Sequence, residues 1–279
     1  MSSVRGLLNN VIPFSSVDGP GNRAVVFLQG CNLTCVYCHN PYTIGLCTHC
    51  GECIEPCPED ALSFHEGTVV VDWEACTRCG VCIDVCPESS TPLAETVTPG
   101  EVVERVRRSA PFVSGVTISG GEATVQPDFL VALTEAFKDD PMYGSKSVLI
   151  DSNGKAPSGL WDRLAPTIDG VMLDLKAWDP ADHELLTGAG NAEVLESLSH
   201  LSSLGLLAEV RFVLVPGWND DPDHLDAMAE HLAGFDVPLK LIRARHHGVD
   251  DPVYDEPPAD HAEAVAERFR ARGVAVRVV

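Results

Sequence analysis

The chain contains 279 residues, of which 45% are hydrophobic and 22% are charged, a composition that supports a buried core and excludes a disordered or fibrous protein. Its 19 Lys and Arg residues stand against 41 Asp and Glu residues, which gives a formal net charge of −22. Because binding to nucleic acid or to an anionic membrane surface requires basic patches, we expect neither of them as a partner.

Strands and helices alternate along most of the chain. Strands are predicted at 24–29, 115–119, 147–151, 170–175, 208–215 and 237–242, and helices at 101–109, 128–138, 160–165, 182–204, 222–233 and 259–272. Nearly continuous apolar strands separated by amphipathic helices predict a parallel sheet that is covered by helices. Six such units are fewer than the eight of a closed barrel.

The expected cellular compartment decides how the eleven cysteines are interpreted. Residues 1–20 lack the layout of a secretory signal, and no window of about 18 residues is apolar enough to span a bilayer. We therefore expect a cytoplasmic protein. In such a reducing compartment, many cysteines indicate metal binding rather than disulfides.

All eleven cysteines lie between positions 31 and 86, in three runs. The runs are Cys31-x3-Cys35-x2-Cys38, then Cys47-x2-Cys50-x2-Cys53-x3-Cys57-Pro58, then Cys76-x2-Cys79-x2-Cys82-x3-Cys86-Pro87. The second and third runs have the spacing of bacterial two-cluster ferredoxins, in which the fourth cysteine of each run ligates the other cluster. That pairing groups Cys47, Cys50 and Cys53 with Cys86, and Cys76, Cys79 and Cys82 with Cys57. The alternative is a pair of structural zinc sites with four cysteines each.

The first run has only three cysteines, which cannot complete the four-thiolate shell of a [4Fe–4S] cluster. An incompletely ligated metal is available to bind a substrate, as in catalytic zinc sites. The alternative for this run is a zinc site that His39 completes.

Several short motifs accompany the first cysteine run. In chain order they are Val17-Asp18-Gly19-Pro20-Gly21-Asn22-Arg23, Tyr37-Cys38-His39-Asn40, Ser119-Gly120-Gly121-Glu122, Asp151-Ser152-Asn153-Gly154, Asp174-Leu175-Lys176 and Arg211-x4-Pro216-Gly217. Together they resemble the glycyl radical enzyme activating enzymes of the radical S-adenosylmethionine (SAM) superfamily, over nearly the whole chain. The cysteine-rich insert resembles that of the activases of diol and related dehydratases, and Asn40-Pro41-Tyr42 most resembles the YjjW-type activases.

The resemblance implies a fold and a division into domains. Residues 1–45 and 93–279 would form a partial (β/α)6 barrel of the TIM-like radical SAM type. Residues 46–92 would form an inserted ferredoxin-like module with two [4Fe–4S] clusters. We expect three clusters in one monomeric chain.

The implied reaction begins with SAM bound to the open iron of the cluster on Cys31, Cys35 and Cys38. One electron from a flavodoxin or ferredoxin-type reductant would cleave SAM to methionine and a 5′-deoxyadenosyl radical, which takes a hydrogen atom from a glycine of a partner glycyl radical enzyme. The open alternatives are another radical SAM enzyme, acting on a small molecule, a peptide or RNA, a non-enzymatic electron carrier, and a structural zinc protein. The charge of −22 disfavours an RNA substrate.

The resemblance also assigns residues to SAM. Carbonyl and carboxylate oxygens suit the ammonium of SAM, which is only a donor, and glycine lets backbone approach a ligand closely. The resemblance places the motif at Gly120, Gly121 and Glu122 there, whereas an ordinary glycine turn is the alternative. Ser152, Asn153 and Asp174 are expected in the same site.

Basic and aromatic side chains complete the expected SAM contacts. The resemblance places Lys176 near the methionyl carboxylate and Arg211 at the wall of the site, although either could be a solvated charge at the rim. Tyr37 and His39 would lie against the adenine. His247, rather than His246, is the expected further contact with the nucleoside.

Asp151 and Asp174 end consecutive strands and, with Ser152 and the backbone of Met172, offer oxygen ligands for a hard cation. The resemblance implies a monovalent cation, while capping of a loop by Asp151 is the alternative. Residues 18–21 are expected to contact the glycine loop of the partner, unless they form a plain turn.

Overall fold

The computed structural model describes residues 4–249 and 251–279. Residues 1–3, which the expected barrel domain includes, lie outside the described part. No described helix is both long enough and apolar enough to cross a bilayer.

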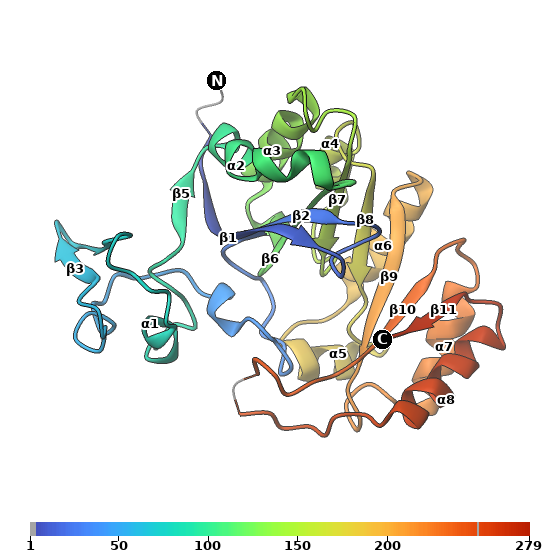
Figure 1. Ribbon diagram of the computed structural model, residues 1–279. Coiled ribbons are helices and arrows are strands. Elements are labelled where there is room, and N and C mark those ends of the chain that lie inside the picture. Colours follow the sequence, from blue (N-terminus) through green and yellow to red (C-terminus); the bar gives the residue numbers. More distant parts are fainter. Residues whose placement is uncertain (1–3, 250) are drawn as a thin grey trace.

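A nine-stranded sheet forms the centre of the molecule (Figure 1). Its strands, in spatial order, are β11 (Val276–Val278), β10 (Leu239–Arg243), β9 (Leu207–Leu214), β8 (Gly170–Asp174), β7 (Ser147–Ser152), β6 (Gly115–Gly120), β2 (Arg23–Leu28), β1 (Gly6–Ser15) and β5 (Glu95–Val97). The pairs from β2 to β11 are parallel, whereas β1 pairs antiparallel with both β2 and β5. The predicted α/β fold with a mostly parallel sheet is confirmed.

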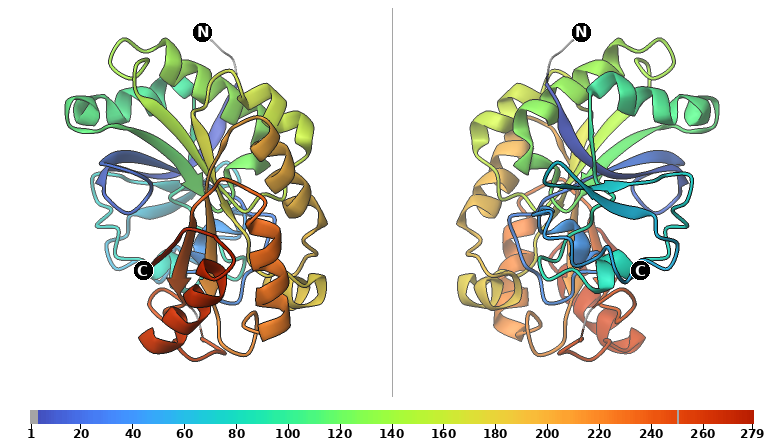
Figure 2. Two further views of the ribbon diagram at one scale, coloured as in Figure 1. Left: turned by 90° about the vertical axis from the view of Figure 1, so that its right-hand side faces the viewer. Right: turned by 90° about the vertical axis from the view of Figure 1, so that its left-hand side faces the viewer.

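Helices form an arc around one side of the curved sheet (Figure 2). They are α2 (Pro99–Val106), α3 (Pro127–Asp139), α4 (Ser158–Leu164), α5 (Pro180–Thr187), α6 (Ala192–Ser203), α7 (Pro222–Leu232) and α8 (Ala259–Arg270), with short 3-10 turns η1 (Pro41–Thr43), η2 (Arg107–Phe112) and η3 (Ala123–Val125). Helix α2 begins at a capping box in which Thr98 and Glu101 satisfy each other's backbone N–H groups. Each parallel crossover thus returns over the same face of the sheet.

The structure corrects the expected elements in two places. The helix predicted at 182–204 is two helices, because α5 ends at Gly188, whose φ of +78° is left-handed and stops the helix. Strands β1, β5 and β11 were not predicted, and β11 adds a seventh parallel strand beside β10. All six predicted parallel strands are present.

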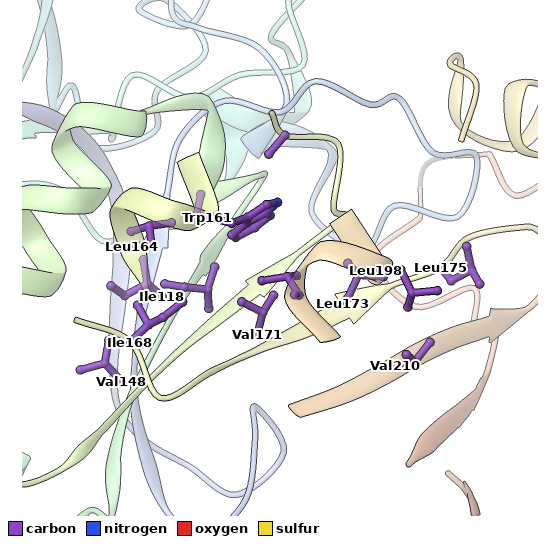
Figure 3. Close-up of a cluster of buried hydrophobic side chains, with 14 of the residues drawn as sticks. Ile118, Val148, Trp161, Leu164, Ile168, Val171, Leu173, Leu175, Leu198 and Val210 are labelled. Carbon is purple, nitrogen blue, oxygen red and sulfur yellow. The ribbon is translucent and has the colours of Figure 1, made fainter. Parts of the chain in front are cut away.

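Strand residues alternate between a helix-covered face and an inner face. Val116 and Ile118 of β6 belong to the main apolar core, in which Trp161 and Leu164 of α4 also lie (Figure 3). Thr117 of β6 instead accepts a hydrogen bond from Arg23 at 2.7 Å. The inner face is therefore partly polar, as a face that lines a site must be.

One end of this inner face is closed by the chain between β1 and β2. Arg23, only 1% exposed, donates to the carbonyls of Val116 and Ser147 at 2.6 and 3.0 Å. Thr117 Oγ1 donates to the carbonyl of Asp18 at 2.7 Å. These bonds hold residues 16–22 against the amino-terminal ends of the strands.

The cysteine-rich segment projects from the side of the sheet (Figure 1). It contains a two-stranded sheet of β3 (Leu62–His65) and β4 (Thr68–Val71) and one turn of helix, α1 (Val81–Asp84). Its buried hydrophobic cluster consists of Cys53, Leu62, Val69 and Cys82, and Ala61, Ser90 and Thr91 are buried as well. The segment has little regular structure, and its small core includes two thiols.

Candidate functional site

The predicted site residues gather at a cavity of about 310 Å³ at the carboxyl ends of the parallel strands. Of these residues, the cavity is lined by Cys31, Cys35, Tyr37, Cys38, His39, Gly120, Gly121, Glu122, Asp151, Ser152, Asn153, Asp174 and Lys176. Asp18 lines it as well. The predicted site residues Arg211 and His247 do not line this cavity.

Cys31 begins a loop that backbone hydrogen bonds hold over the cavity. Its own N–H donates to the carbonyl of Ile44 at 3.1 Å. Thr34 and Val36, on either side of Cys35, donate to the last carbonyls of α5, at Thr187 and Leu186. These bonds use carbonyls that a helix end leaves without partners, so the loop is positioned by the ends of other elements.

The same loop is fixed on its other side by an asparagine pair. Asn153 donates from Nδ2 to Oδ1 of Asn32 at 2.8 Å, and Asn32 donates to the carbonyl of Lys155 at 2.8 Å. Asn32 was not predicted as a site residue. It follows Cys31 directly, and its amide joins the cysteine loop to the end of β7.

The separation of the thiols tests which metal group they fit. A tetrahedral zinc ion with Zn–S bonds of about 2.3 Å holds its sulfurs about 3.8 Å apart, but no three cysteine sulfurs among the described residues lie within 4.8 Å of one another. All eleven cysteines are thiols rather than disulfides. The thiols are therefore not arranged as a preformed tetrahedral zinc site.

Burial raises the pKa of the Cys31 thiol to about 12 and that of Cys35 to about 11, with Lys176 opposing both shifts. Both groups are therefore protonated at neutral pH without a metal. Because a metal binds the thiolate, loading this site must release protons.

Lys176 and Asp174 form the charged wall of the cavity. Lys176 Nζ lies 2.5 Å from Asp174 Oδ2 and 5.6 Å from the centre of the Tyr37 ring. Burial alone would lower the pKa of Lys176, but Asp174 outweighs it and raises the pKa well above its ordinary value. The ammonium is thus a permanent cation beside Cys35 and Tyr37.

Glu122 is buried and already well supplied with donors. Its carboxylate accepts hydrogen bonds from the N–H and hydroxyl of Thr124, from the Ser152 hydroxyl and from the Asn153 N–H, at 2.7 to 3.0 Å. Burial raises its pKa, and these donors oppose the rise. Glu122 therefore joins the ends of β6 and β7, with only one of the four bonds at Oε2.

The two glycines before Glu122 allow the backbone there to pack closely against the backbone at and just after the end of β2. A Cβ on Gly120, whose φ is +138°, would lie 2.2 Å from the carbonyl oxygen of Leu28, and one on Gly121 would lie 2.5 Å from that of Gly30. The expectation was that glycine lets backbone approach a ligand. In the structure the close neighbour is the end of β2.

Arg211 lies behind the cavity wall and is 7% exposed. It donates to Asp151 and to Glu209, both at 2.8 Å, and the Ser119 hydroxyl donates to the other oxygen of Asp151 at 3.0 Å. Burial raises the pKa of Asp151 to about 6, against the effect of Arg211. Arg211 supports Asp151, which lines the cavity, and is not itself among the lining residues, so its expected contact with SAM stays a prediction.

Each expected cation ligand already has a basic partner: Asp151 pairs with Arg211, and Asp174 pairs with Lys176. A cation bound between the two carboxylates would compete with both side chains. The monovalent-cation site stays a prediction.

His39 and His247 lie on neighbouring segments, but only His39 lines the cavity. A Cβ on Gly248 would lie 2.7 Å from the carbonyl oxygen of His39, so the loop after β10 packs against it. His247 is exposed, and His246 Nε2 lies 2.7 Å from the carbonyl oxygen of Tyr254. Neither histidine of that loop reaches the cavity in this conformation.

Three apolar residues that were not predicted also line the cavity: Phe27 of β2, Val213 of β9 and Ile242 of β10. Period-2 alternation along each strand places them on the inner face with Ser119 and Asp151. That alternation was available in the sequence and could have found them. Together with Asp18, they extend the cavity from the cysteine loop into the interior of the sheet.

The remaining eight cysteines line two small cavities in the projecting segment. One is lined by Cys47, Cys50, Cys53 and Cys86, and the other by Cys57, Cys76, Cys79 and Cys82. The last cysteine of each run thus lies with the first three of the other run. This is the grouping that the ferredoxin spacing predicts.

The Radical SAM superfamily model matches residues 25–229. The pyruvate formate-lyase-activating enzyme of Streptococcus mutans serotype c is 31% identical over 234 residues, which cover 82% of this chain and 73% of that protein. The (2S)-3-sulfopropanediol sulfolyase activating enzyme of Bilophila wadsworthia is 32% identical over 269 residues, covering 89% and 87%.

The fold is also similar to that of QueE from Escherichia coli. That crystal structure has a TM-score of 0.55 at 14% identity and covers 99% of this chain and 94% of its own. The matched family, the activating-enzyme relatives and the cavity with its three thiols agree. The chain therefore belongs to the radical SAM superfamily, among the glycyl radical enzyme activating enzymes.

Proposed function

We propose that this protein binds SAM at a [4Fe–4S] cluster held by Cys31, Cys35 and Cys38 and activates a partner glycyl radical enzyme. The observation that carries the proposal is one cavity that places three thiols opposite a permanent cation, Lys176. When bound, the cluster and SAM supply one-electron cleavage to a 5′-deoxyadenosyl radical, which takes a hydrogen atom from a glycine. The protein supplies binding, orientation and exclusion of water.

Different residues of the chain would bind different groups of SAM. Lys176 provides the positive charge for the methionyl carboxylate, and Asp174 keeps that charge in place at 2.5 Å. The free acceptor capacity of Glu122 Oε2 and the backbone at Gly120 and Gly121 suit the SAM ammonium. Tyr37, which is 5% exposed, presents a ring beside Lys176 for the adenine.

The partner's glycine would enter from the end of the cavity that Asp18 lines. Phe27, Val213 and Ile242 provide apolar walls between Asp18 and the cysteine loop. An apolar, water-poor path protects a carbon radical from side reactions. Residues 18–21, held by Thr117 and Arg23, are the segment nearest to this end.

We further propose that residues 46–92 form a ferredoxin-like domain with two [4Fe–4S] clusters, inserted into a barrel domain of residues 1–45 and 93–279. The crossed grouping of the eight thiols around two cavities supports this division. The thiols in such numbers favour a reducing, cytoplasmic location. We infer a monomer that receives electrons from a flavodoxin or ferredoxin-type donor.

The test is anaerobic reconstitution with iron and sulfide, followed by metal analysis and a dithionite-driven assay for 5′-deoxyadenosine. We expect about 12 irons per chain, from three four-iron clusters, and release of the nucleoside. An electron-spin resonance signal of a glycyl radical in a candidate partner would identify that partner. Zinc in place of iron, or about eight irons without nucleoside, would refute the proposal.

A further inference from the structure

The projecting segment and the cysteine loop of the barrel meet through two residues, Ile44 and Gly45. The carbonyl of Ile44 accepts the N–H of Cys31 at 3.1 Å. The N–H of Gly45 donates to the carbonyl of Ser89 at 2.9 Å. A cysteine of the barrel and Ser89, in the segment that leaves the insert, are therefore both bonded to one dipeptide.

Gly45 is in direct contact with the other arm of the insert. A Cβ at this position would lie 2.0 Å from the carbonyl oxygen of Glu88. Real Cβ atoms do not approach backbone oxygens this closely, so only glycine fits here without movement of either segment. The two arms of the insert, residues 44–47 and 86–89, thus touch at the point where they join the barrel.

Gln29 holds this junction from the barrel side. It is 1% exposed, and its Nε2 donates to the carbonyls of Tyr42 and Gly45 at 2.8 and 2.7 Å. Its Oε1 accepts from Asn9 at 2.7 Å. A buried amide with every polar atom bonded fixes the position of residues 42–45 beside Cys31.

The two cavities of the insert differ in how they connect to this junction. Cys47 lies two residues after Gly45, and Cys86 lies three residues before Ser89, so both arms lead to the cavity of Cys47, Cys50, Cys53 and Cys86. In the other set, Cys57 and Cys76 donate to Ile54 and Asp72, within the insert. We call the first set the near site and the second set, Cys57, Cys76, Cys79 and Cys82, the outer site.

The near and outer sites are themselves adjacent. Cys53 of the near site and Cys82 of the outer site belong to one buried cluster with Leu62 and Val69. Cys79 of the outer site lies next to Arg78, the only Lys or Arg residue between positions 46 and 92, and both Cys79 and Cys50 of the near site are exposed. The chain therefore offers a linear order of outer site, near site and barrel site.

We propose that the Ile44–Gly45 junction is the path by which electrons pass from the near site to the barrel site, and that they reach the near site from the outer site. The inference rests on the proposed function, because it requires clusters at all three sites. In each transfer, one electron leaves a reduced one-electron carrier protein and arrives at the group on Cys31, Cys35 and Cys38. No bond forms or breaks in the insert, and no proton is consumed there.

The test compares reconstituted wild-type protein with Gly45→Ala and Gln29→Met. Reduced ferredoxin is the donor, and freeze-quench electron-spin resonance follows reduction of the barrel cluster, which added SAM distinguishes from the other two. We expect both variants to slow that reduction by about tenfold or more, since small displacements are costly in a pre-aligned contact. Gly100→Ala is the matched control, because its Cβ would meet no atom within 4 Å.

The outcomes decide the proposal. Wild-type rates in a Gln29→Met protein with full iron content would overturn it, and this variant decides if Gly45→Ala does not fold. The order of sites has its own test with dithionite. Cys86→Ala should slow reduction of the barrel cluster more than Cys76→Ala does, because it breaks the step next to the barrel, and the reverse result would overturn the order.

Failure of the proposed function would be seen separately. In that case the wild-type protein itself would release no 5′-deoxyadenosine with dithionite. If the wild-type protein is active and the junction variants transfer electrons at its rate, only the path is wrong.

Discussion

The parallel sheet with its helices, proposed above as the barrel domain, and the cysteine-rich segment 46–92, proposed as the insert, are held together in different ways. The barrel has a contiguous apolar core between its parallel sheet and the surrounding helices, with side chains such as Trp161 and Phe137 fully buried. The buried hydrophobic cluster of the insert contains two aliphatic side chains, Leu62 and Val69, and two thiols, Cys53 and Cys82. A core this small cannot offset the entropy of ordering the segment.

This difference shows that the two regions depend on their cysteines for folding to different degrees. In the barrel, Cys31, Cys35 and Cys38 lie on a loop that Ile44, Leu186 and Thr187 already position by backbone bonds. In the insert, thiols make up half of the buried cluster. Loss of the bound groups should therefore remove function from the barrel and structure from the insert.

The largest effect is expected from the barrel cysteines. Replacing Cys31, Cys35 and Cys38 together with Ala should reduce dithionite-driven release of 5′-deoxyadenosine below detection, because no ligand remains for the group that binds SAM. The far-UV circular dichroism spectrum should stay as in the wild type. A triple variant that still cleaves SAM would remove the basis of the proposed function.

Cys47→Ala and Cys76→Ala are the companion variants in the insert. With dithionite they should weaken cleavage without abolishing it, because this small reductant can reach the barrel directly. A loss as complete as that of the triple variant would mean that the insert is needed to build the barrel site.

The second-largest effect is expected from removal of iron with a chelator, which should affect the two regions differently. Backbone amides of β3 and β4 should lose their protection from hydrogen exchange, whereas those of β6, β7 and β8 should keep theirs, because only the insert depends on the metal for its core. Hydrogen exchange read by mass spectrometry measures both regions in one sample. Equal loss of protection would contradict the comparison.

A smaller effect is expected from the buried charges that stiffen the barrel. Arg211→Met leaves Asp151 and Glu209 without their cation, and breaking a buried pair from one side costs about 3–5 kcal/mol of unfolding free energy. The control Arg163→Met breaks an exposed pair with Asp128, for which about 0–1 kcal/mol is expected. Urea unfolding measures both, and equal losses would refute the assigned role of Arg211.

The smallest effect concerns pH and the contact between α5 and α7. His224 Nδ1 lies 2.8 Å from Asp182 Oδ2, and this hydrogen bond raises the pKa of His224 above its ordinary value of 6.5. Because the folded-state pKa is the higher one, the stabilisation is complete below pH 6.5 and is lost as the pH rises through the raised value. The group is partly exposed, so the contribution is below about 1 kcal/mol.

The measurement for His224 is the difference in Tm between the wild type and His224→Gln from pH 6 to pH 8. The difference should shrink as the pH rises. A constant or growing difference would show that His224 contributes by packing and not by charge.

Much of the fold was predictable because apolar periodicity is a local property. The six parallel strands all appear within one or two residues of their predicted bounds. Strand β1 escaped prediction because Asn9, Asn10 and Pro13 interrupt its apolar pattern. Helix 182–204 was read as continuous because its apolar spacing runs past Gly188, where only the left-handed backbone ends α5.

The sequence by itself determined the three cysteine groups, the positions of six parallel strands and the residue types at their carboxyl ends, because spacing and alternation are local properties of the chain. Only the tertiary structure decided which charges pair: Lys176 with Asp174 beside the cavity, and Arg211 with Asp151 behind it. It alone also placed Gly45 against Glu88 and Cys31 beside Ile44. Such contacts join residues far apart in the chain, and their distances depend on how the sheet curves and where the insert leaves it.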